Sequence, residues 1–191
     1  MIAILLAALA IQSAPVPACS HDREALLALD QQAFDQDRNG GWRPLVESGC
    51  YAEAAELIAA YRERHGNQAT ILYWHEGQLR AMAGETTAAV ALFNRARHPG
   101  GNALDASWNL YVDGSVAFLN RDRPALLAAR DASAAMERPD TISVVVEDGT
   151  AHDVPLPAGI RWPPNLHVLD GLLACYAEPY AIAYACPPGG N

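Results

Sequence analysis

One stretch of the chain, from Thr70 to Pro99, has the pattern of two amphipathic helices joined by a tight turn at Gly84. Apolar residues on both sides of this glycine recur at helical spacing. The second segment is rich in alanine, so its backbone can approach the first helix closely while Leu92 and Phe93 fill the space between them. The stretch therefore predicts an antiparallel helical hairpin.

The same pattern, a turn residue followed by an alanine-rich segment, recurs along the chain at nearly constant spacing. Gly49 precedes Gly84 by 35 residues and Asn120 follows it by 36, and each of these positions comes just before an alanine-rich segment. A period of this length is typical of stacked helix-turn-helix units. The chain has 191 residues and is 51% hydrophobic, which is enough for one domain with its own core but cramped for two. We therefore expect a single all-α domain over residues 19–191.

The central unit resembles the tetratricopeptide repeat, a helix-turn-helix unit of about 34 residues, at its aromatic, glycine and alanine positions. The matching residues are Tyr73, Gly77, Gly84, Ala89, Phe93 and Ala96. The resemblance covers about residues 42–136 and implies a right-handed stack of antiparallel hairpins that recognises a protein or peptide in a concave groove. It places on that groove five residues of the leading central helix: Ile71, Trp74, Gln78, Ala81 and Met82. A plain all-α stack of hairpins is the alternative, in which Trp74 is ordinary core.

Segments outside the repeat-like region have other patterns. β-branched residues on both sides of Asp148–Gly149 predict a β-hairpin insert over about residues 141–157. Asn165 is suited to cap a final helix over Leu166–Tyr176, which we expect to cover the end of the stack. At the other end of the chain, apolar spacing predicts one helix over about His21–Asp35.

The first eighteen residues have the pattern of a secretory signal peptide. An apolar run over Ile2–Ile11 is too short to span a bilayer, and Val16–Ala18 suits cleavage by signal peptidase. Residues 1–18 are therefore predicted to be removed on export to the periplasm or the exterior, leaving no transmembrane segment. An unusually apolar first helix is the alternative. Cys19 also occupies the position of the acylated cysteine of bacterial lipoproteins, in a poorly matching context, so a lipid-anchored envelope component is a second possibility.

Four cysteines remain after Ala18, an even number that suits an oxidising compartment. Antiparallel packing of the first two helical segments would bring Cys19 near Cys50, which leaves Cys175 and Cys186 as the second pair. The latter two flank Pro179, where the final helix should end and the tail fold back. Four unpaired buried thiols are the alternative. No CxxC spacing indicates a zinc or thioredoxin-type site.

The segment Asp35-Gln36-Asp37-Arg38-Asn39-Gly40 matches the first half of an EF-hand calcium loop. Asp35, Asp37 and Asn39 supply oxygen ligands at the first, third and fifth positions, and Gly40 stands at the turn. The twelfth position is Val46, which cannot close the site as a bidentate glutamate would. The segment predicts either a low-affinity calcium site or a solvated turn, since Asp and Asn are also common turn formers.

Charge and motif content disfavour several function classes. The net charge of −9 and only 13 basic residues oppose nucleic-acid binding, which needs clustered Lys and Arg. No nucleophile motif, HExxH zinc motif or glycine-rich phosphate loop occurs, so the sequence indicates neither an enzyme nor a cofactor. We therefore expect an exported binding module for a protein or peptide, with a structural or lipid-anchored envelope component as the alternative. The sequence does not address its oligomeric state.

Overall fold

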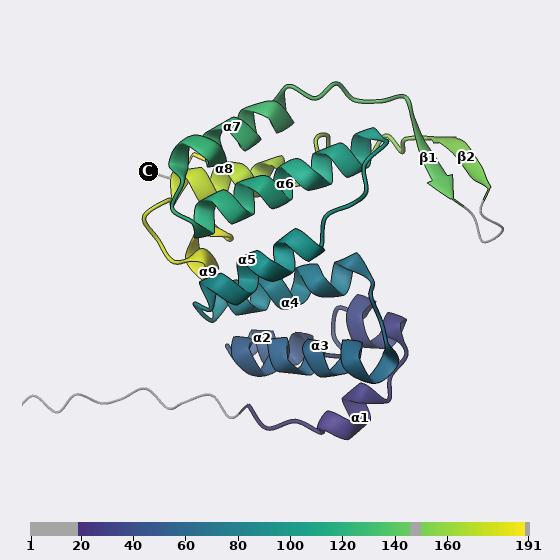
Figure 1. Cartoon of the computed structure of the whole chain (residues 1–191), viewed down its shortest axis with the longest axis vertical. Coiled ribbons are helices and arrows are strands. Elements are labelled where there is room, and N and C mark those ends of the chain that lie inside the picture. The colour runs from purple at the N-terminus through teal and green to yellow at the C-terminus, as the bar shows by residue number, and fades with distance from the viewer. Residues whose placement is uncertain (1–18, 146–149, 190–191) are drawn as a thin grey trace, which may run out of the picture.

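The computed structural model describes residues 19–145 and 150–189, which form a mostly helical fold with one small β-hairpin. The predicted signal peptide and the Asp148–Gly149 turn lie outside the described residues. Figure 1 shows three tiers, with α1–α3 at one end, α4 and α5 in the middle, and α6–α8 at the other end. The elements are α1 (Arg23–Leu27), the π-helix η1 (Gln32–Gln36), α2 (Arg43–Glu47), α3 (Tyr51–His65), α4 (Thr70–Met82), α5 (Thr86–Arg95), α6 (Ala103–Leu119), α7 (Arg123–Ala134), β1 (Thr141–Val145), β2 (Ala151–Pro155), α8 (Leu166–Ala174) and α9 (Tyr180–Ala183).

The central helical hairpin is confirmed. Helices α4 and α5 lie antiparallel, and Gly84 between them has a φ of 83°, a value that glycine adopts without steric cost. Gly77 lets the two helices approach closely, since a Cβ at this position would lie 2.7 Å from the Phe93 ring. Leu92 and Phe93 are buried in the seam, as the apolar spacing predicts.

The expected single helix over His21–Asp35 is wrong, because the chain breaks into α1 and η1. The Leu29 carbonyl accepts a hydrogen bond from the Tyr61 hydroxyl of α3 at 3.0 Å. Asp30 then accepts a hydrogen bond from the backbone N–H of Ala33, which is the usual role of a helix N-cap. A tertiary contact and a new cap therefore interrupt a segment that local spacing alone would continue.

The apolar residues form two clusters that share α4. One joins α1–α3 to Leu72 and Leu79, and the other joins α5–α9 to Tyr73 and Trp74. Consecutive residues of α4 thus pack into different clusters, so this helix connects the two parts of the core. Because α4 is buried on both sides, few of its side chains remain available to solvent.

The carboxyl-terminal segment forms two helices where one was expected. Helix α8 packs against α6 and α7, as a capping helix would. The chain then turns at Pro179, and α9 returns to contact α4 and α8. Tyr180 of α9 is buried between Phe93 and Phe118, with ring centroids 6.2 and 5.9 Å away. The tail therefore joins the middle and final tiers.

Strands β1 and β2 form the predicted antiparallel hairpin, which Figure 1 shows extending away from the helices beyond α6 and α7. Its base is fixed by the guanidinium of Arg138, which donates hydrogen bonds to the carbonyls of Ile160 and Pro157 at 2.9 Å. Among the described residues, none of the helices has the length and apolar character that crossing a bilayer requires.

Candidate functional site

The five residues that the repeat resemblance assigns to a concave groove lie mainly in the interior. Trp74 is 3% exposed and stacks on Phe93 at 4.3 Å, and Ala81 is 5% exposed. The prediction that Trp74 and Ala81 are exposed in a groove is therefore corrected, because α5, α6 and α9 cover the face of α4 that carries them. Ile71 and Met82 are half-buried and pack against both cores.

Gln78 is half-buried and lies beside a group of buried tyrosines. Its amide is a hydrogen-bonding neighbour of the hydroxyls of Tyr111 and Tyr180, but burial dominates and raises the pKa of both phenols well above the ordinary value. Among the residues that the structure describes, none offers the buried hydroxyls of Tyr180 and Ser115 a partner of good hydrogen-bond geometry. These polar side chains lie in the packing between α4, α6 and α9. Gln78 is part of that packing rather than of an open groove.

A small cavity of about 190 Å³ opens beside the ends of α4 and α6. It is lined by Ala81 and Met82, together with Phe118, Arg121 and Tyr180. The Arg121 guanidinium is held by the carbonyl of Tyr176, to which it donates a hydrogen bond at 2.6 Å. Two of the predicted groove residues, Ala81 and Met82, thus line a hollow.

The two carboxylates of the predicted calcium half-loop, Asp35 and Asp37, have different protein partners. Asp35 is fully buried, and its carboxylate accepts hydrogen bonds from the Trp42 indole at 3.0 Å and from His75 at 2.7 Å. Asp37 accepts a bond from the backbone N–H of Asn39 and so forms an exposed turn. In place of an open half-loop, the segment forms a buried anchor followed by a turn. The Asp35 carboxylate faces the interior, and the Asp37 carboxylate binds the backbone N–H of Asn39.

The Asp35 carboxylate is the centre of a polar network that no sequence motif indicated. Burial alone would raise the pKa of Asp35, but the hydrogen bonds and charge of His75, with further bonds from Trp42 and Gln36, lower it below the ordinary value. The guanidinium of Arg43 lies 4.2 Å above the Trp42 ring and donates to the Asp35 carbonyl. The network ties η1, α2 and α4 together. Its members come from distant segments of the chain, so the sequence alone does not indicate that they are in contact.

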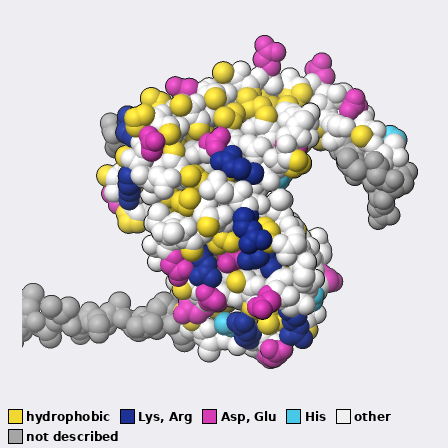
Figure 2. All heavy atoms as spheres, viewed as in Figure 1, with side chains coloured by type: hydrophobic (Ala, Val, Ile, Leu, Met, Phe, Trp, Pro, Cys, Tyr) yellow, Lys and Arg dark blue, Asp and Glu magenta, His cyan; other side chains and the backbone are white. Residues whose placement is uncertain are grey.

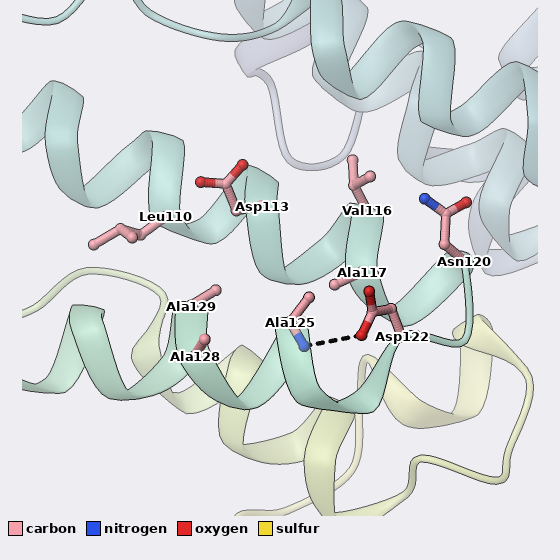
Figure 3. Close-up of a pocket in the computed structure, with 9 residues that line it drawn as sticks. All are labelled: Leu110, Asp113, Val116, Ala117, Asn120, Asp122, Ala125, Ala128 and Ala129. Carbon is pink, nitrogen blue, oxygen red and sulfur yellow. Dashed lines mark hydrogen bonds between the residues drawn. The ribbon is translucent and has the colours of Figure 1, made fainter.

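A hollow with a volume of about 480 Å³ lies between α6 and α7. Figure 3 shows α6 and α7 as its two walls, with the small side chains of Ala125, Ala128 and Ala129 on the α7 side. Figure 2 shows apolar side chains gathered on this face of the final tier. The remaining lining residues are Leu110, Asp113, Val116, Ala117, Asn120 and Asp122. We call this hollow the α6–α7 groove.

The α6–α7 groove is apolar along its floor and acidic at its edge. Asp113 is paired with Arg97 at 2.5 Å, and Asp122 accepts a hydrogen bond from the backbone N–H of Ala125. None of the residues that line the groove is a histidine, serine or cysteine. The groove therefore offers a surface for apolar contact, with charge at the rim rather than reactive groups in the floor. Sequence reasoning missed it because its alanines resemble ordinary interior positions of a hairpin.

Both predicted disulfides are present. Cys19 pairs with Cys50 and Cys175 with Cys186, with Cα–Cα distances of 5.7 and 6.2 Å. Two disulfides fit an extracellular or periplasmic protein. Cys19 and Cys50, with Glu53, are also the only group of potential metal ligands gathered closely among the residues described, and both sulfurs are used by the disulfide. A thioether-linked lipid on Cys19 would require that same sulfur atom.

Comparison with known proteins gives no match to a family model, to a curated protein or to a solved structure. The α6–α7 groove therefore has to be interpreted from its own geometry.

Proposed function

We propose that this protein is an exported binding module that holds an amphipathic helix of a partner protein in the α6–α7 groove. In this proposal its three hairpins, α2–α3, α4–α5 and α6–α7, stack in the manner of tetratricopeptide repeats. The binding surface is then the outer face of the last hairpin rather than the face of α4. The two disulfides support export, since such bonds persist in oxidising compartments.

The observation that carries the proposal is the shape and lining of the α6–α7 groove. From Leu110 to Asn120 it follows α6 for about 15 Å at the helical rise of 1.5 Å per residue. This length suits three turns of a bound helix, whose apolar residues at positions i, i+3 and i+4 would enter the groove. The alanines of α7 leave room for such side chains. A small polar ligand is less well served, because the floor lacks the convergent polar groups that would orient it.

The charges predict the character of the partner helix. Asp113 and Asp122 lie at the edge of the groove, and the whole chain has a net charge of −9. A helix with basic residues beside its apolar face would therefore associate more readily than an acidic one. Arg97 neutralises part of the charge of Asp113, so the preference should depend on salt but not vanish at physiological ionic strength.

The proposal can be tested with a synthetic amphipathic helix of leucine and lysine as the probe, measured by fluorescence anisotropy. We expect Ala128→Arg to weaken binding at least about tenfold, or about 1.4 kcal/mol, because the new side chain fills the groove. The matched control is Ala134→Arg, an exposed alanine of the same helix that does not line the groove. Equal affinities of the two variants would overturn the proposal, as would equal binding of a leucine and glutamate helix.

A further inference from the structure

The turn between η1 and α2 contains an asparagine followed by a glycine. Asn39 is the only asparagine of the chain that has glycine after it. In such a pair the backbone nitrogen of the glycine can attack the asparagine carboxamide, because glycine has no side chain to obstruct the approach and adopts many backbone conformations. The sequence alone therefore makes Asn39 more reactive than the other asparagines.

The structure leaves the carboxamide of Asn39 free to react. Asn39 is exposed, and its backbone N–H donates to the Asp37 carboxylate at 2.9 Å. Its side-chain amide has no hydrogen-bond partner within residues 19–145 and 150–189. Several other asparagines instead have their amide nitrogen bound, namely Asn67, Asn94, Asn102 and Asn109. Exposure and the lack of a partner thus single out the same residue as the sequence does.

The attacking nitrogen, that of Gly40, is also weakly held. Its N–H donates to the Asp37 carbonyl at 3.4 Å, which is longer than the usual range of about 2.7–3.2 Å. Residues 36–39 are all exposed, so opening this turn uncovers no apolar side chain. An exposed turn with a long closing bond opens at little cost in free energy. The Gly40 nitrogen can therefore reach the Asn39 carboxamide while the helices stay folded.

We propose that Asn39 deamidates spontaneously and that the isoaspartyl product weakens the buried Asp35 anchor. The backbone nitrogen of Gly40 attacks Cγ of Asn39, and the new C–N bond closes a five-membered succinimide. The carboxamide nitrogen leaves as ammonia, which takes up the backbone proton through solvent. Water then opens the ring at either carbonyl, giving aspartate at one and isoaspartate at the other. The reaction consumes only water and needs no oxidant or reductant.

The isoaspartyl product lengthens a segment that is fixed at both ends. It adds one carbon to the main chain between Asp35 and Trp42, whose side chains share a hydrogen bond of 3.0 Å in the interior. Gly41 cannot take up the extra length, since its backbone lies so close to Phe34 that a Cβ would be 1.8 Å from the Phe34 carbonyl oxygen. The added carbon must therefore displace Asp35 or Trp42 from the other.

Peptide mapping by mass spectrometry tests the reaction on the disulfide-intact protein during incubation in mildly alkaline buffer. Asn39 should convert to aspartate and isoaspartate before any other asparagine, at a rate within about tenfold of that in the urea-unfolded chain. Gly40→Ala should slow the conversion at least about tenfold, because its methyl group obstructs the attack. The new Cβ meets only the exposed Asp37 side chain, which can move. An Asn39 that stays intact while the unfolded chain converts would overturn the proposal, as would equal rates for Gly40→Ala and wild type.

Urea denaturation of the separated products tests the effect on the anchor. Ion exchange separates deamidated from unmodified protein, and Asn39→Asp is the matched control, with the same charge as the isoaspartyl form but a main chain of normal length. The isoaspartyl form should unfold at a lower urea concentration than Asn39→Asp does. Equal midpoints for the two would show that the turn absorbs the added carbon, and would overturn the proposed effect on Asp35.

Discussion

Replacing Asp35 by alanine should destabilise the fold far more than removing a surface carboxylate. The change leaves the buried indole N–H of Trp42 and the ring nitrogen of half-buried His75 without their acceptor. Each stranded donor costs about 1–3 kcal/mol, and breaking a buried charged network costs about 3–5 kcal/mol. We therefore expect Asp35→Ala to lower the free energy of unfolding by about 4 kcal/mol. Asp35→Asn keeps the volume and an acceptor oxygen and should cost about half as much.

The control is Asp30→Ala, which also removes a carboxylate near the same turn. Asp30 accepts a single backbone hydrogen bond, from Ala33, at the surface. Its loss should cost about 1 kcal/mol, the usual effect of deleting a helix cap. Urea denaturation with the disulfides intact, followed by tryptophan fluorescence, measures all three variants. A loss for Asp35→Ala no larger than that for Asp30→Ala would refute the assignment of Asp35 as an anchor.

The same network predicts how stability depends on pH. The pKa of Asp35 is lower in the folded protein than the ordinary value of 3.8. A depressed pKa means that the carboxylate stabilises the fold fully above about pH 4 and loses this effect as pH falls through the folded pKa. The gap in stability between wild type and Asp35→Asn should therefore be full at pH 7 and narrow steadily below pH 4. A gap that stays constant or widens in acid would contradict this reasoning.

Two further perturbations test the packing and the covalent links. Gly77→Ala should lower the free energy of unfolding by about 1–2 kcal/mol, because its Cβ would lie 2.7 Å from the Phe93 ring. Gly159→Ala is the control and should be neutral, because a Cβ there would have no atom of the described residues within 4 Å. Thermal unfolding compares the two variants. Serine replacement of both members of Cys19–Cys50 should cost about 4 kcal/mol in urea denaturation, and of Cys175–Cys186 about 3 kcal/mol, since the first closes 31 residues and the second 11. The reverse order would exclude loop length as the deciding factor.

Local signals in the sequence were sufficient where structure is determined by neighbouring residues. The turn at Gly84, the left-handed glycine cap at Gly66 that ends α3, and the proline in the first turn of α7 all follow from backbone preferences within a few positions. The cysteine pairs could be inferred as well. Antiparallel helices bring the start of one segment to the end of the next, and this constraint made Cys19–Cys50 the favoured pair.

Contacts between distant segments account for the features that the sequence did not reveal. The break between α1 and η1 depends on Tyr61, which is 32 residues from the Leu29 carbonyl that it binds. The direction of Asp35 depends on His75, 40 residues away. An Asp-x-Asp-x-Asn-Gly pattern is equally compatible with calcium ligands and with one buried acid followed by a turn. Only the position of the histidine decides between them.

The candidate binding surface differs from the predicted one for a related reason. A repeat resemblance assigns residues to a concave face as though each leading helix were followed by further units, so that one face stays open along the whole array. In this chain the tail returns instead, and Tyr180 of α9 packs beside Gln78 and against the Phe93 ring, over the face of α4 where the groove was expected. The last hairpin, α6–α7, differs from α4 because only one of its sides is covered. Helix α8 covers one side of α6 and α7, while none of the helices in the described part of the chain covers the side with Ala125 and Ala128. The face that a following unit would cover in a longer array is here the face that carries the α6–α7 groove, where we propose that a partner helix binds.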